Sequence, residues 1–192
     1  MTLYCISLFL EKAKISKLIK FSMENGLSCK ELQITDQTGE SGKGNQIDAG
    51  GIKILLLPCN DFHKDGDFEI GLTTKNKENW TRFVKRAGKA FKIEKGKLDD
   101  EGTEYLLMES DEENHGNFFF IFDGQLSDAN SLSKISCTVK NQDSIFFKEK
   151  ISQFLDADLL EKIEITSGEL FSLNELRTKK EGKEIIFPIT QI

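Results

Sequence analysis

The chain has 192 residues, of which 38% are hydrophobic and 30% are charged, and its net charge is −6. This apolar content is enough to offset chain entropy, so the composition excludes an intrinsically disordered protein. Acidic and basic residues are interspersed and no basic stripe stands out, which argues against nucleic acid as the main partner.

The first predicted element is a strand over residues 3–10, with the sequence LYCISLFL. No cationic segment precedes this run, and it is too short to span a membrane. We therefore expect a cytoplasmic protein with no membrane partner. The cysteines contain no Cys-x-x-Cys pair and are expected to be reduced thiols. They are Cys5, Cys29, Cys59 and Cys137.

Three segments of the chain repeat the order strand, amphipathic helix and return strands. Leu10, Lys75 and Lys140 coincide in one register, because 75 − 10 and 140 − 75 are both 65. Asn is a favoured N-cap, since its side-chain oxygen accepts a hydrogen bond from an unpaired backbone N–H. The positions expected to begin the three helices are Glu11, Asn76 and Asn141.

The return strands complete three βαββ or βαβββ units. A helix after every third or fourth strand leaves one sheet face uncovered, which favours a curved sheet. The sequence therefore predicts an α+β fold in which repeated βαβββ-like units form curved mixed sheets with helices on the outside. Residues 1–124 are expected to form one domain from two units, and residues 131–192 a third unit.

The two histidines lie in polar, acidic loops of the predicted fold. His63 follows the return strands of the first unit, and His115 lies in the sequence DEENHGNFFFIFD, which we interpret as a hairpin. A general base must reach its substrate, and neither histidine lies on a strand face. We interpret both as solvated loop residues, and their roles stay open.

The middle unit resembles the vicinal oxygen chelate superfamily, which includes glyoxalase I, bleomycin-resistance proteins and extradiol dioxygenases. Residues 67–93 resemble the strand-helix segment of that family, and residues 103–122 resemble its closing hairpin. Asp111 and the pair Gly116-Asn117 stand in for the turn before the last strand. The resemblance implies two βαβββ modules that pair into a cup-shaped sheet.

The resemblance also implies where a metal would bind. Metal-dependent members hold a divalent cation through His, Glu or Gln near the start of a module's first strand and on its last strand. This chain has Tyr4, Leu56, Leu57 and Phe120 at such positions, and only Glu69 matches. One carboxylate cannot hold a divalent ion, which needs about three or more protein ligands. We therefore predict no cofactor.

Our leading hypothesis is a metal-independent, small-molecule-binding protein of the glyoxalase/bleomycin-resistance type. Phe-rich walls would surround the ligand, and Glu69 would be the polar anchor. The residues predicted to line the cup are Glu69, Tyr105, Phe118, Phe120 and Trp80.

Two alternatives stay open. A metal-dependent lyase or dioxygenase of the same fold would use Glu69, Glu109 and His115 as ligands. A protein-protein interaction module would have no pocket. Because two modules already complete a cup, the third unit needs something to pair with, either another unit or, most simply, the same unit of a second chain, and we expect a homodimer.

Overall fold

The computed structural model describes most of the chain. The described residues are 1–35, 41–61, 63–87, 92–97, 104–111, 114–124, 127, 129–169 and 171–191. The first module consists of β1 (Thr2–Leu10), α1 (Lys12–Glu24), β2 (Ser28–Thr35), β3 (Ser41–Asp48) and β4 (Lys53–Pro58). The second consists of β5 (Phe68–Thr74), α2 (Lys77–Ala87), β6 (Lys92–Lys97), β7 (Glu104–Asp111) and β8 (Asn114–Phe122).

The two modules form one mixed sheet of eight strands, in the order β2-β3-β4-β1-β5-β8-β7-β6. Each module pairs its first strand in parallel with its last strand, β1 with β4 and β5 with β8. The first strands β1 and β5 join the modules as an antiparallel pair at the centre of the sheet. The modules are thus arranged in the same way on either side of this pair, which confirms the predicted α+β class.

The third unit has a different strand order. It consists of η1 (Ala129–Ser131), β9 (Leu132–Lys140), α3 (Asn141–Phe146), η2 (Phe147–Ile151), η3 (Ser152–Phe154), α4 (Ala157–Leu160), β10 (Ile163–Gly168), β11 (Ser172–Lys180), β12 (Lys183–Ile186) and η4 (Ile189–Gln191). Its sheet has the order β10-β9-β11-β12, and β9 is parallel to the next strand, β10. The shared strand-helix start is therefore confirmed, but the third unit is not a third copy of the module.

Only one of the three predicted N-caps makes a side-chain cap bond. Asn76 Oδ1 accepts a hydrogen bond from Asn79 N at 2.9 Å, as an N-cap does. Glu11 is at the N-cap of α1 but its side chain makes no cap bond. Asn141 is the first residue of α3, whose N-cap is Lys140. The predicted helix starts are thus correct to within one residue, while the capping chemistry holds only at Asn76.

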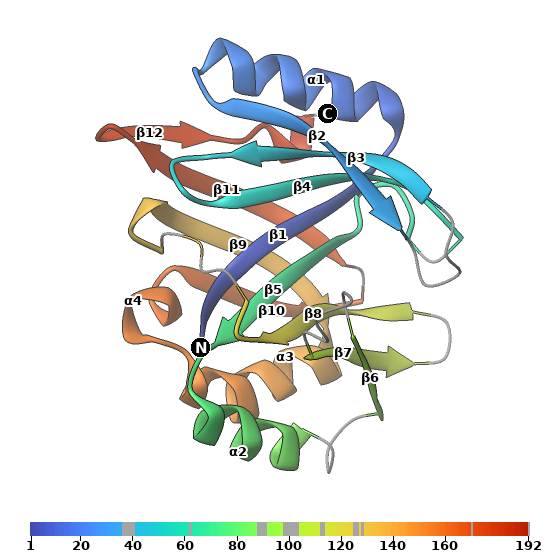
Figure 1. Ribbon diagram of the computed structural model, residues 1–192, viewed down its shortest axis with the longest axis vertical. Helices are drawn as coiled ribbons and strands as arrows, with labels where there is room; N and C mark the ends of the chain where they lie inside the picture. Colours follow the sequence, from blue (N-terminus) through green and yellow to red (C-terminus); the bar gives the residue numbers. More distant parts are fainter. Residues whose placement is uncertain are drawn as a thin grey trace.

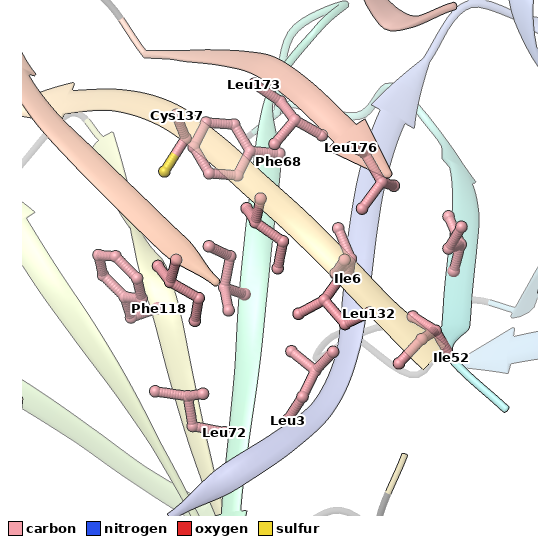
Figure 2. Close-up of a cluster of buried hydrophobic side chains, with 14 of the residues drawn as sticks. Leu3, Ile6, Ile52, Phe68, Leu72, Phe118, Leu132, Cys137, Leu173 and Leu176 are labelled. Atoms are coloured by element: carbon pink, nitrogen blue, oxygen red, sulfur yellow. The ribbon is translucent and has the colours of Figure 1, made fainter. Parts of the chain in front are cut away.

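The helices and the third unit cover the same face of the eight-stranded sheet. Figure 1 shows α1 near β12 and α2 beside α3, with the strands of the third unit lying across β1 and β5. Aromatic contacts connect the two modules to the third unit. The ring centroids of Phe118 in β8 and Phe147 are 5.3 Å apart, and those of Phe83 in α2 and Phe154 are 5.8 Å apart. Figure 2 shows one continuous core in which Leu3, Ile6, Ile52, Phe68, Leu72 and Phe118 meet Leu132, Cys137, Leu173 and Leu176.

A glycine turn also holds the third unit against the first module. Gly50, between β3 and β4, has φ +71°, and a β-carbon there would lie 2.2 Å from the carbonyl oxygen of Lys179 in β11. The Nζ atom of Lys180 donates to the carbonyl oxygen of Gly26 at the end of α1. The turn and β11 therefore meet backbone to backbone, which only glycine permits here.

The prediction of a homodimer began from a third unit without a partner inside the chain. In the structure this unit is packed against the two modules of its own chain, so that reason no longer applies, and the homodimer stays a prediction. No described helix is long and apolar enough to cross a membrane.

Candidate functional site

The other face of the eight-stranded sheet carries the candidate site. Side chains alternate between the faces of a strand, and directly paired residues share a face. Ile6 pairs with Ile70, and both belong to the core, so the next pair, Ser7 and Glu69, points to the opposite face. We call this surface the Glu69 face.

An irregular register in β1 adds an aromatic side chain to the Glu69 face. Leu3 pairs with Leu72 and Cys5 with Gly71, so Tyr4 is the extra residue of a β-bulge. The ring of Tyr4 packs edge-on against Phe119, with centroids 6.1 Å apart. Bulges of this kind often re-aim side chains next to functional sites.

Two further contacts complete this aromatic group. The Nζ atom of Lys53 lies 5.2 Å from the centroid of the Tyr4 ring, and burial lowers the pKa of Lys53. Phe119 in turn lies over Gly71, where a β-carbon would come within 2.4 Å of its Cζ atom. Lys53, Tyr4 and Phe119 therefore form a continuous line of contacts across the sheet, which we call the Tyr4–Phe119 group.

His63 lies against this face from the segment that joins β4 to β5. Its ring stacks on Phe9 with centroids 3.6 Å apart and planes 4° apart. Its Nε2 atom lies 3.3 Å from Oε1 of Glu69, and the two side chains are 15% and 14% exposed. Oδ1 of Asn60 accepts a hydrogen bond from the backbone N of His63 at 2.7 Å. The interpretation of His63 as a solvated loop residue is therefore wrong.

The segment that carries His63 is tied to the first module by its neighbours. The backbone N of Gly66 donates to the carbonyl oxygen of Phe9, and the backbone N of Phe9 donates to that of Asp67, both at 2.9 Å. Oδ1 of Asp65 accepts from the backbone N of Glu11 at 2.9 Å. These bonds fix the segment over the end of β1 and hold His63 at Glu69.

Asp65 also forms an ion pair with α1. Its Oδ2 atom lies 2.7 Å from Nζ of Lys14. The hydrogen bond from Lys14, followed by that from the backbone N of Glu11, lowers the pKa of Asp65. The carboxylate thus serves the start of α1 and does not belong to the Glu69 face.

Cys5 lies close to Glu69 and Ser7 but cannot supply a thiolate. Burial, with a smaller contribution from the charge of Glu69, raises the pKa of Cys5 to about 12. Its Sγ atom lies 4.0 Å from Oγ of Ser7. A thiol with this pKa stays protonated and is not a nucleophile at neutral pH.

The structure does not bring the predicted ligand-binding residues together. Phe118, Phe120 and Trp80 are 0%, 2% and 6% exposed, and they lie in the core on the side opposite Glu69. Alternation along β8 places their neighbour Phe119, which was not predicted, on the Glu69 face. Tyr105 pairs with Ile121 in the β7–β8 ladder, and its side chain lies outside the described part of the structure.

The described residues of the Glu69 face do not fit a divalent metal. Ser7 and Leu55 lie beside Glu69 on β1 and β4, and Phe119 is the side chain of β8 near it. Leu56 and Phe120, the positions considered from sequence, point into the core. In the part of the chain that the structure describes, no three His, Cys, Asp or Glu residues are grouped to hold a metal.

Comparison with solved structures places the arrangement among known folds. The 2,2',3-trihydroxybiphenyl 1,2-dioxygenase of Sphingomonas wittichii strain RW1 matches with a TM-score of 0.50 and 9% identity, over 78% of this chain and 56% of that one. BphC, a halotolerant catechol dioxygenase, also matches with a TM-score of 0.50, at 12% identity, over 78% of this chain and 54% of that one. A glyoxalase I mutant from Zea mays has a TM-score of 0.44 and 13% identity, over 67% of this chain and 46% of that one.

This chain therefore spans just over half the length of each of the two dioxygenases. No family model matches the sequence, and no curated protein sequence matches it. At these identities the likeness concerns the fold alone.

Proposed function

Because the eight-stranded sheet has the vicinal oxygen chelate fold, we propose that its Glu69 face binds a small organic molecule without a metal ion. The observation that carries the proposal is the pair of Glu69 and His63. A carboxylate and an imidazole lie 3.3 Å apart, both are mostly withdrawn from solvent, and an aromatic ring backs the imidazole. Binding sites combine mostly apolar walls with a few fixed polar groups of this kind.

The surroundings of Glu69 support an organic ligand over a metal ion. Beside Glu69 on the neighbouring strands lie the buried hydroxyl of Ser7, the aliphatic carbon of Leu55 and the aromatic ring of Phe119. Divalent cations prefer several oxygen or imidazole ligands, whereas apolar walls favour a carbon skeleton. In this proposal Glu69 orients the ligand and the aromatic side chains enclose it.

A metal-dependent lyase or dioxygenase is the second candidate. One observation favours it: the β7–β8 ladder pairs Glu109 with His115, which brings two of its three proposed ligands to neighbouring positions. The side chains of both residues lie outside the described part of the structure. An irregular register separates this pair from the part of the ladder that contains Phe119.

Thermal unfolding with and without Mn²⁺, Ni²⁺, Zn²⁺ and Fe²⁺, together with metal analysis of the isolated protein, separates the two candidates. A metal that binds the native state stabilises it by about 2.7 kcal/mol at a hundredfold excess over its Kd. The proposal predicts no metal-specific rise in Tm and no stoichiometric metal. A rise that Glu69→Gln and His115→Gln each abolish would establish the metal-dependent candidate instead. A protein-interaction module would show neither the metal effect nor binding of small molecules.

A further inference from the structure

The charge on the Glu69 face points to the chemical class of the ligand. Oε1 of Glu69 faces His63, and no other polar contact of this carboxylate is present among the described residues. The side chain is only 14% exposed, and no described residue donates a hydrogen bond to its second oxygen. A partly desolvated carboxylate binds N–H donors strongly, and cationic donors most strongly.

Aromatic rings lie on both sides of the Glu69–Ser7 pair. Phe9 with His63 is two residues from Ser7 along β1 in one direction, and Cys5 beside the Tyr4–Phe119 group is two residues away in the other. At 3.3 Å per residue these two positions are about 13 Å apart, with Glu69 between them. A ligand anchored at Glu69 therefore has rings on either side of it.

The aromatic rings, like the carboxylate of Glu69, favour a positively charged ligand. The face of an aromatic ring attracts cations because of its quadrupole. Lys53 already uses Tyr4 in this way, with its Nζ atom 5.2 Å from the ring centroid. Lys53 and His63 would instead attract an anion. A cationic and an anionic ligand would therefore be held by different side chains of the Glu69 face.

We propose that the ligand is a small organic cation, a primary amine carried on a flat apolar group. Its ammonium donates to the second oxygen of Glu69, and its apolar part packs between Phe9 and Phe119. This inference rests on the proposed function, because it assumes that the Glu69 face binds a small molecule.

Three probes with the same ring test the charge class: benzylamine, benzyl alcohol and benzoate. Binding is measured at pH 8 from the amide chemical shifts of Ser7, Glu69, Gly71 and Phe119. We expect benzylamine to bind about tenfold more tightly than benzyl alcohol, which corresponds to about 1.4 kcal/mol, and benzoate to bind most weakly.

Matched variants locate the effect. Glu69→Gln keeps the shape of the side chain and should weaken benzylamine more than benzyl alcohol, so that the preference for the amine is lost. Glu164→Gln, on the third unit, removes an exposed carboxylate that pairs with Lys134 and should change nothing. Retained amide spectra show that both variants are folded.

The outcomes distinguish a failure of the proposed cationic ligand class from a failure of the proposed binding function. Equal affinity for benzylamine and benzyl alcohol, or tighter binding of benzoate, overturns the cationic class while the proposed binding face stands. Binding of none of the three probes at this face overturns both.

Discussion

The ring of Phe119 lies across Gly71 on the neighbouring parallel strand, where a β-carbon would come within 2.4 Å of its Cζ atom. The missing side chain at residue 71 leaves the space that this ring occupies. From there Phe119 reaches the edge of Tyr4. Gly71 thus leaves the space in which Phe119 forms a wall of the Glu69 face.

Gly71→Ala should displace the Phe119 ring and lower the free energy of unfolding by about 1–3 kcal/mol, the usual cost of overpacking. In a Phe119→Ala background the same substitution should cost less than about 0.5 kcal/mol, because the obstructing ring is gone. Urea unfolding of the two single variants and the double variant measures this coupling. Equal costs of Gly71→Ala in the two backgrounds would show that the contact does not exist.

Gly50→Ala tests the docking of the third unit on the first module. The left-handed backbone of Gly50 costs a side chain about 1 kcal/mol, and the contact with the Lys179 carbonyl adds to that cost, so we expect a loss of about 2 kcal/mol or more. Gly66→Ala is a matched control, because Gly66 has φ +93° with open space around its α-carbon. A loss at residue 50 no larger than that at residue 66 would argue against the close approach.

Asp65→Asn tests the anchoring of the segment that carries His63. Folding lowers the pKa of Asp65, so its ion pair with Lys14 stabilises the protein above the ordinary aspartate range near pH 4, and this stability is lost as the pH falls through the lowered value. The pair is near the surface, so we expect a deficit of up to about 1 kcal/mol at pH 7 that shrinks towards pH 3. Urea unfolding across this range measures it. A stability deficit of Asp65→Asn that grows as the pH falls would contradict this prediction.

Cys5 and Cys137 should resist thiol reagents in the folded protein. Burial raises the pKa of each to about 12, and only the thiolate reacts. Cys59 is partly exposed, and although burial raises its pKa too, it should be labelled first. Mass spectrometry of the native protein after timed labelling at pH 8 reads out the order. Labelling of Cys5 as fast as Cys59 would show that β1 opens readily.

Much of the fold follows from local patterns in the sequence. Alternating apolar residues and the Asn76 cap indicate where strands and helices begin, and Glu69 lies on the sheet face that lacks helices, opposite the core. The strand order of the third unit could not be predicted from the sequence. The pairing of β9 with β10 depends on contacts that no local pattern encodes.

The candidate site was predicted only in part, for a reason visible in β8. Phe118, Phe119 and Phe120 are consecutive and equally apolar, so period-2 alternation cannot indicate which of them faces the core. His63 was missed because its contact with Glu69 requires the chain to reverse through residues 64–67. The turn residues Asp65 and Gly66 are the one local signal of that reversal.

We propose that the Glu69 face binds a small molecule without a metal ion. The most direct test is an amide chemical-shift map of the chelator-treated protein with a library of small aromatic and aliphatic fragments. We expect the shifts to gather at Ser7, Glu69, Gly71 and Phe119, and Glu69→Gln to weaken the binding of the fragments that cause them. Shifts that appear only after a divalent metal is restored, or that gather elsewhere on the molecule, would contradict it.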